Sequence, residues 1–301
     1  MKAVVLERFG GPEELRLSEV ARPEPGPGQV RVHVRTAGVN PFDGKVRSGS
    51  MEAVFRTSLP TILGSEVAGV VDAVGPDVTG LAVGDAVFGF ADSGSYAEYT
   101  LATSVARKPE GLSWEHAVTL PVAGETTDRV LRLLDVQPGE TLLVHGAAGG
   151  VGSVAVQVAV AAGLRVIGTA GPDNQEHVAA LGATPTTYGE GLVERVRALA
   201  PEGIDAVFDV AGKGALPDSI ELRGGTDRIV TIADSAAGEL GVVFTGGPQQ
   251  RSAERLAELA DLAVQGKLRT TVAATFPLAE AAEAHRVSGA GHVRGKIVLT
   301  A

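Results

Sequence analysis

The sequence contains no cysteine. This absence excludes disulfide bonds, a thiolate nucleophile and any zinc site built on cysteine ligands. Histidine is scarce, and its residues show neither the spacing of metal ligands nor a Ser-His-Asp hydrolase pattern, so we expect structural roles for them. They are His33, His116, His145, His177, His285 and His292.

An excess of basic residues is also missing. The chain has 26 lysines and arginines against 36 aspartates and glutamates, and a formal net charge of -10. This balance weighs against nucleic acid and anionic membranes as partners. No apolar run reaches the roughly 18 residues of a membrane span, and the N-terminal residues turn charged too soon for a signal peptide. We therefore expect a cytoplasmic protein.

What remains is an ordinary globular composition in 301 residues, with 44% hydrophobic residues and 40 glycines scattered without a period. This length accommodates two domains. The first part, to about residue 115, reads as β-rich, because short apolar or alternating runs are separated by glycine and proline. The expected strands cover residues 30–35, 67–74, 83–88 and 96–99. We predict a barrel-like or partly open β domain here.

Strands and helices alternate after residue 115, which is typical of a parallel α/β sheet. The expected strands cover residues 141–145, 165–169, 204–210 and 228–232, and residues 242–244 are a candidate to close the sheet. An amphipathic helix over 252–264 follows. The last elements, from residue 271 to the strand 296–299, are placed back in the first domain by the family resemblance described below.

The strongest motif is His145-Gly146-Ala147-Ala148-Gly149-Gly150-Val151-Gly152. It lies between a buried strand and a long apolar helix, the order that a dinucleotide site requires. Glycines let the backbone approach a pyrophosphate, and the amides of the helix N-terminus point toward it. The alternative is a tight strand–helix turn without a ligand. We predict a dinucleotide site.

The strand that follows this helix ends in Ile167-Gly168-Thr169-Ala170-Gly171. NAD-specific sites usually place an Asp or Glu at this strand end, where it binds the ribose hydroxyls. No carboxylate stands there, and the nearest one, Asp173, lies further into the loop. No lysine or arginine stands there either. The missing carboxylate predicts NADPH as the cofactor.

Nearly the whole chain resembles the zinc-independent quinone oxidoreductases, the zeta-crystallin-like branch of the medium-chain dehydrogenase/reductases. The resemblance depends on the order and spacing of several stretches, none of which is specific alone. They are residues 38–43 (GVNPFD), 47–49 (RSG), 64–71 (GSEVAGVV), 74–75 (VG), 84–87 (GDAV), 96–99 (YAEY), 120–124 (LPVAG), 147–152 (AAGGVG) and 295–298 (GKIV).

This resemblance implies the architecture and the activity. A GroES-like domain is expected from residues 1–118 and 270–301, and a Rossmann domain from residues 119–269, with nicotinamide and substrate in the cleft between them. NADPH is expected to deliver a hydride to a quinone or an activated C=C bond. Homodimers are expected as well, joined by edge strands of the Rossmann sheets, for which residues 242–244 are the candidate.

Zinc is not expected. Zinc alcohol dehydrogenases of this superfamily use a Gly-His-Glu motif and catalytic cysteine ligands, whereas this chain has Gly64-Ser65-Glu66 and no cysteine. The Lewis acid used for alcohol oxidation is therefore missing. We interpret Glu66 as a carboxylate paired with a neighbouring group.

The resemblance also supplies the candidate site residues, position by position. The catalytic candidates are Asn40 and Lys45. The cofactor candidates are Asn40 and Thr126 near the nicotinamide; Gly149, Gly150 and Val151 at the pyrophosphate; Thr169, Ala170, Asn174 and Tyr188 at the 2′-phosphate end; Val210, Ala211 and Gly212 along the adenosine-to-ribose path; Ile232, Phe244 and Thr245 toward the nicotinamide; and Arg294 and Lys296 at the tail.

Two stretches depart from the family pattern. Gly171 and Asn174 stand where NADPH-binding relatives often carry a serine and a basic residue. Glu125 and Asp128 stand where the family usually has apolar and aromatic residues. These carboxylates either reshape the pocket or face solvent at a helix start, where the helix dipole favours them; we favour the second interpretation. Asn40 can equally cap a helix, and Lys45 can equally be a solvated lysine.

Two other functions compete with a general quinone or enone reductase. The first is a dedicated enoyl or polyketide-type reductase of a biosynthetic pathway, which the departures at Lys45, Glu125 and Asp128 would suit. The second is a non-catalytic NADPH-binding protein. The presence of Asn40 and Thr126 weighs against a dead active site.

Overall fold

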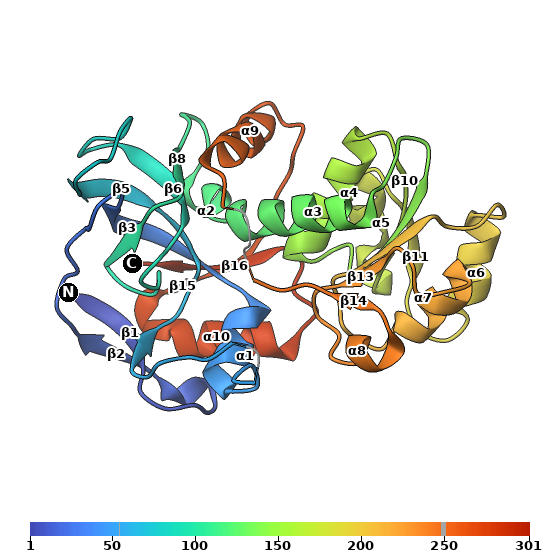
Figure 1. Cartoon of the computed structure of the whole chain (residues 1–301), viewed down its shortest axis with the longest axis horizontal. Helices are drawn as coiled ribbons and strands as arrows, with labels where there is room; N and C mark the ends of the chain where they lie inside the picture. The colour runs from blue at the N-terminus through green and yellow to red at the C-terminus, as the bar shows by residue number, and fades with distance from the viewer. Residues whose placement is uncertain (54, 248–250) are drawn as a thin grey trace. The chain divides into compact units, whose positions relative to one another are not determined.

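The computed structural model describes residues 1–53, 55–247 and 251–301. The chain forms two compact units, one from residues 1–122 with 251–301 and the other from residues 123–250. The last segment of the chain, red in Figure 1, thus belongs to the same unit as the first segment, blue. The units are separated at 122/123 and 250/251, whereas the sequence boundaries were expected at 118/119 and 269/270.

The first unit is β-rich. Its strands are β1 (Lys2–Leu6), β2 (Leu15–Glu19), β3 (Val30–Val39), β4 (Thr61–Ile62), β5 (Glu66–Val74), β6 (Ala86–Phe90), β7 (Tyr99–Ala102), β8 (Val105–Arg107), β15 (Val272–Pro277) and β16 (Lys296–Thr300). Its helices are η1 (Pro12–Glu14), α1 (Pro41–Ser48), α2 (Trp114–Ala117), α9 (Ala253–Val264), η3 (Leu278–Glu280) and α10 (Ala281–Ala290).

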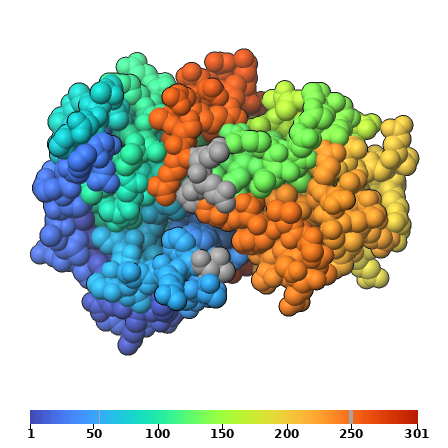
Figure 2. Space-filling model, viewed as in Figure 1, coloured from blue at the N-terminus to red at the C-terminus, as the bar shows by residue number. Residues whose placement is uncertain are grey.

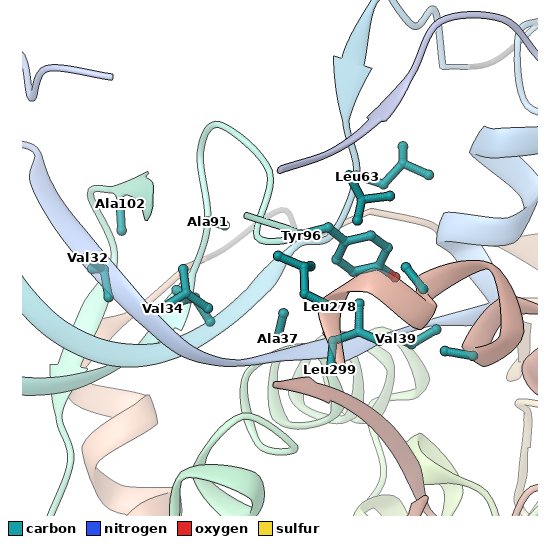
Figure 3. Close-up of a cluster of buried hydrophobic side chains, with 14 of the residues drawn as sticks. Val32, Val34, Ala37, Val39, Leu63, Ala91, Tyr96, Ala102, Leu278 and Leu299 are labelled. Atoms are coloured by element: carbon teal, nitrogen blue, oxygen red, sulfur yellow. The ribbon is translucent and has the colours of Figure 1, made fainter. Parts of the chain in front are cut away.

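Among the described residues, these strands form a seven-stranded sheet in the order β15-β16-β3-β5-β6-β8, with β7 paired to β3, and a small sheet β2-β1-β4. Alternate residues of β3 point into the core, where Val32 and Val34 are almost completely buried. Figure 3 shows the Tyr96 ring in this core beside Leu63 and Leu278, with its hydroxyl directed toward α10. The core therefore joins the N-terminal strands to the C-terminal segment.

Helix α9 accounts for the shifted boundary at residue 250. Ser252 caps it by accepting a hydrogen bond from the Arg255 N–H. Its apolar side, Leu256, Leu259 and Ala260, is buried, and the helix contacts β8 of the first unit. Figure 2 shows its orange-red surface against the green and cyan surface of the first unit. The amphipathic helix expected over 252–264 is present, but it packs on the β-rich unit.

The second unit alternates strands and helices. Its strands are β9 (Thr141–His145), β10 (Arg165–Ala170), β11 (Thr184–Thr187), β12 (Ala206–Asp209), β13 (Ile229–Thr231) and β14 (Val243–Phe244). Its helices are α4 (Gly150–Ala161), η2 (Pro172–Asn174), α5 (Gln175–Ala180), α6 (Leu192–Leu199), α7 (Leu216–Arg223) and α8 (Ala237–Leu240), and α3 (Pro121–Leu134) enters it from residue 123.

These strands form one sheet in the order β11-β10-β9-β12-β13-β14, and every pair is parallel. Numbered from β9, this is the order 3-2-1-4-5-6 of a Rossmann fold. Both faces are covered, because Leu142 and Val144 pack toward α3, α4 and α5 while Leu143 packs toward α6, α7 and α8. The structure thus has the predicted classes of domain, a β-rich unit and a Rossmann unit with a parallel sheet.

Some elements were missed or displaced in the sequence analysis. Strand β11 contains Pro185, which has no backbone N–H to donate to a neighbouring strand. The strand tolerates this proline because it lies at the edge of its sheet. The strand expected over 96–99 begins only at Tyr99. Within the described residues, no helix is long and apolar enough to cross a membrane.

Candidate nucleotide and active site

The predicted cofactor residues of the second unit follow the carboxyl ends of its strands. Because all strands are parallel, these ends meet at one edge of the sheet, where open α/β sheets bind ligands. Along this edge the candidates follow the strand order: Thr169 and Ala170 on β10, residues 149–151 after β9, residues 210–212 after β12, Ile232 after β13, and Thr245 after β14. The topology thus brings residues distant in sequence into one row.

The glycine turn after β9 is tightly built. Gly146 has φ of 77°, a left-handed conformation that favours glycine. A Cβ atom at Gly152 would lie 2.1 Å from the Gly146 carbonyl oxygen, so α4 approaches the turn more closely than a side chain allows. Helix α4 begins at Gly150, and the free amides of its first turn are suited to bind a phosphate.

His145 ends β9 inside the sheet and is almost completely buried. Its Nδ1 lies 3.2 Å from the Thr169 hydroxyl and its Nε2 lies 3.0 Å from the Ser219 hydroxyl. Ser219 donates its own hydrogen to the Ala215 carbonyl, so its oxygen accepts from His145. Burial lowers the pKa of His145 to about 4, against a smaller opposing effect of Asp209. His145 is a neutral, hydrogen-bonded structural residue, consistent with the role expected for it.

The expected 2′-phosphate candidates lie at and after the end of β10 and, for Tyr188, directly after β11. Thr169 and Ala170 are buried, Asn174 is half-buried in η2, and Tyr188 is exposed. The sequence analysis missed Gln175, whose side-chain amide donates to the carbonyls of Ala170, Gly171 and Thr186. This glutamine fixes the loop in which NAD-specific proteins would place a carboxylate.

Asp209, at the end of β12, was also missed. Its Oδ1 accepts hydrogen bonds from the backbone amides of Ala211 and Gly212 at 3.0 and 3.1 Å. Its Oδ2 accepts from the Thr231 hydroxyl at 2.7 Å. The carboxylate therefore fixes the backbone of the candidate segment 210–212 and links this segment to β13. An Asp that ends an apolar strand before a glycine is the signal that could have indicated it.

Glu125 does not face solvent, so the favoured interpretation of this carboxylate is wrong. It is only 8% exposed, and its Oε1 accepts from the Arg129 Nε at 2.9 Å. Arg129 also donates from Nη1 to the Thr245 hydroxyl at 2.6 Å, and a longer contact of 3.4 Å joins Nη2 to the Thr126 hydroxyl. This buried cluster connects two predicted nicotinamide residues, Thr126 on α3 and Thr245 after β14. Asp128 is half-buried.

In the first unit, Asn40 lies at the start of α1 and is 7% exposed. Its Oδ1 accepts from the Lys296 Nζ at 2.7 Å, and its Nδ2 donates to the Glu66 Oε2 at 2.8 Å. Lys296 and Glu66 form a buried ion pair at 2.5 Å. Gly38 leaves the space for this carboxylate, since a Cβ there would lie 2.3 Å from the Glu66 Oε2. The amide of Asn40 is therefore held in one orientation.

A second chain of hydrogen bonds supports α1 from behind. Arg47 can only donate, so the His285 Nδ1 accepts from it, and the His285 Nε2 is left to donate to the Tyr96 hydroxyl. Tyr96 then donates to the Asp43 Oδ2, which also accepts from the Asn40 backbone amide. Burial raises the pKa of Asp43 to about 6, and burial together with Arg47 lowers the pKa of His285 to about 4. Neither these hydrogen bonds nor their direction could be predicted from the sequence.

The remaining candidates lie at less enclosed positions of the first unit. Lys45 is half-buried on α1, one turn from the helix end, and Arg294 is exposed just before β16. Lys296, by contrast, is buried on β16 and bound to Glu66 and Asn40. The structure thus brings Asn40 and Lys296 together.

Comparison with known proteins identifies the family. Two family models match, "Alcohol dehydrogenase GroES-like domain" over residues 26–110 and "Zinc-binding dehydrogenase" over residues 181–299. The human protein named "Quinone oxidoreductase" is 32% identical, over 99% of this chain and 97% of its own length. The chain belongs to the quinone oxidoreductase family of the medium-chain dehydrogenase/reductases. It is an oxidoreductase of that family, which confirms the resemblance seen in the sequence.

Other relatives include a domain-sized part of a much longer protein and two solved structures. The pikromycin polyketide synthase component PikAII of Streptomyces venezuelae is 38% identical over 94% of this chain, which spans 8% of that protein's length. The solved quinone oxidoreductase of Coxiella burnetii is 34% identical, with a TM-score of 0.89 over 100% of this chain and 99% of its own. A mycobacterial structure described as complexed with NADPH is 30% identical, with a TM-score of 0.88 and full coverage of both chains.

The donor set does not fit the zinc that one family description mentions. The chain has no cysteine, and Ser65 stands where the zinc enzymes place a histidine. Both oxygens of Glu66 are engaged, Oε1 by the Val122 amide and Oε2 by Asn40 and Lys296. Within the described residues, no group of three or more metal-binding side chains occurs.

Proposed function

We propose that this chain is an NADPH-dependent reductase that transfers a hydride to quinones or to activated carbon–carbon double bonds. The observation that carries the proposal is the row of candidate residues along the carboxyl edge of the parallel sheet, with the glycine turn of residues 146–149 within it. Membership of the quinone oxidoreductase family supports the reaction class.

NADPH is the proposed cofactor. The loop after β10 presents the Gln175 amide toward its own backbone and no carboxylate at the strand end, where an NAD site usually has one. The mycobacterial relative described as complexed with NADPH supports the same choice. The glycine turn and the first amides of α4 would hold the pyrophosphate, and Thr169, Ala170, Asn174 and Tyr188 would surround the 2′-phosphate.

When bound, NADPH supplies the hydride, and the chain positions and stabilises the acceptor. Negative charge develops on the acceptor's carbonyl oxygen, where aimed donors lower the barrier. Asn40 suits this role, because Glu66 uses one of its two amide hydrogens and the amide is fixed by Lys296. Lys45 is the proposed proton donor. Arg294 is proposed to lie near the cofactor.

The test is NADPH oxidation with benzoquinone, phenanthrenequinone, an acyclic enone and an enoyl thioester, with NADH in parallel. We expect turnover of quinones with NADPH preferred, and Asn40→Ala to lower kcat by about 10–1,000-fold. Asn40→Asp also removes the donor at nearly the same shape, but it places a second carboxylate against Glu66, so its loss of kcat should be at least as large. Turnover with NADH alone would overturn the cofactor proposal.

A dedicated double-bond reductase is the second candidate, favoured by the likeness to the polyketide synthase component PikAII. Turnover of only the enone or the thioester in the same assay would assign it. NADPH binding without any turnover would instead favour a non-catalytic NADPH-binding protein. A cytoplasmic location and a homodimer remain part of the proposal.

A further inference from the structure

Glu125, which stands where relatives usually carry an apolar residue, forms a buried ion pair with Arg129. The two side chains are 8% and 9% exposed and one helical turn apart on α3. Burying such a pair is costly unless further hydrogen bonds complete it. The further bond here goes from the Arg129 Nη1 to the Thr245 hydroxyl at 2.6 Å. Arg129 therefore binds both its ion-pair partner Glu125 and the Thr245 hydroxyl.

Thr245 occupies a position at the carboxyl edge of the sheet, directly after β14. Its backbone amide donates to the Thr231 carbonyl, which fixes it to β13. Its hydroxyl oxygen accepts from Arg129, and Arg129 is the sole hydrogen-bond partner of this hydroxyl among the described residues. The hydroxyl hydrogen remains available to donate, and a guanidinium bound to the oxygen strengthens that donation.

We propose that Arg129 is a positioning residue for the nicotinamide half of the cofactor. It holds and polarises the Thr245 hydroxyl, which donates to a carbonyl oxygen of that half, while Glu125 neutralises and orients Arg129. The inference rests on the proposed function, because it needs NADPH along the carboxyl edge. It gives a role to Glu125, one of the residues at which this chain departs from the family pattern.

The experiment compares two ligands by calorimetry. NADPH carries the nicotinamide half, whereas adenosine 2′,5′-bisphosphate lacks it. Thr245→Val removes the hydroxyl at nearly constant shape and should weaken NADPH binding by about tenfold, the loss of one good hydrogen bond. Binding of adenosine 2′,5′-bisphosphate should stay within about twofold. Thr245→Ser, which keeps a hydroxyl, should bind NADPH nearly as the wild type does.

A double-mutant cycle then links Arg129 to Thr245. Arg129→Met with Glu125→Gln avoids leaving a buried charge unpaired. This pair of changes should weaken NADPH binding by a similar factor, and adding Thr245→Val should weaken it little further. Arg197→Met, in the exposed pair Arg197–Glu221 of the same unit, is the matched control and should change neither affinity.

Three outcomes would overturn the inference. Equal losses of affinity for both ligands would mean that the substitutions damage the protein in general. Full additivity of the losses would mean that Arg129 and Thr245 act separately. Unchanged NADPH affinity in Thr245→Val would show that the Thr245 hydroxyl makes no hydrogen bond to the cofactor. The proposed function fails differently. A wild-type protein that binds neither ligand would refute it, and the inference would fall with it.

Discussion

At the scale of single residues, His145 makes the pH dependence of stability predictable. Its imidazole is buried and neutral, bonded at both nitrogens to hydroxyls. The pKa of about 4 in the folded protein lies below the ordinary 6.5, so the unfolded chain binds the proton first. The stability that neutral His145 provides is present above pH 6.5 and is lost as the pH falls through the window from 6.5 to about 4.

We therefore expect His145→Gln to flatten the fall of the unfolding free energy below pH 6.5. Glutamine can hydrogen-bond but does not titrate there. Between pH 7 and 4.5 the wild type should lose about 2 kcal/mol more than the variant in urea-melt experiments. The exposed His116→Gln should follow the wild-type curve. Parallel curves for wild type and His145→Gln would contradict the assignment of the lowered pKa.

The sequence predicts which residues belong to the candidate site better than it predicts which residues contact each other. Asn40 and Lys296 were both selected as candidates, and the structure joins them by a direct hydrogen bond and through Glu66. This junction could not be predicted, because it depends on β16 returning beside β3 from the far end of the chain. Arg129 was missed for a related reason: its role depends on Thr245, a residue 116 positions away.

At the scale of elements, α3 explains why Glu125 was misjudged. The sequence was interpreted with Glu125 and Asp128 at a solvated helix start. The helix begins at Pro121 instead. Glu125 and Arg129 then lie four residues apart on the same side, the spacing at which a glutamate and an arginine meet. Strand β9, by contrast, has the predicted bounds, because an uninterrupted apolar run between turns leaves little choice of period.

The junction of β9 and α4 yields a prediction about an element. Gly152→Ala would place a Cβ 2.1 Å from the Gly146 carbonyl oxygen and force α4 away from the turn. We expect a loss of about 1–3 kcal/mol in unfolding free energy, together with weaker NADPH binding. Gly149→Ala is the matched control, since its Cβ would meet the same oxygen at 3.4 Å with φ of -76°. Its stability should change by less than about 0.5 kcal/mol.

Both variants would be compared by thermal melting, and Gly152→Ala also by titration with NADPH, because Gly149 is itself a pyrophosphate candidate. A wild-type melting curve for Gly152→Ala would show that α4 can shift without cost. Destabilisation of both variants alike would show that the turn is intolerant in general and that the close approach at Gly152 is not its cause.

At the scale of the whole molecule, β14 is an edge strand with apolar side chains. Val243 and Phe244 are 51% and 42% exposed at the outer edge of the Rossmann sheet. Unpaired edge strands invite pairing with another chain, and a two-fold axis would place β14 beside its own copy. Residues 242–244 were the candidate for dimer contact in the sequence, because the family resemblance implies homodimers joined by edge strands of the Rossmann sheets.

We expect the wild type to sediment at about twice the chain mass of 30.6 kDa. Val243→Lys should shift this species toward the monomer, because a charge on a paired edge must be desolvated. Val83→Lys changes an apolar residue that is 66% exposed in the first unit, and it should leave the dimer intact. A monomeric wild type would refute the dimer. A dimer that tolerates Val243→Lys would place the interface elsewhere, so the experiment separates the assembly from the strand that we propose for it.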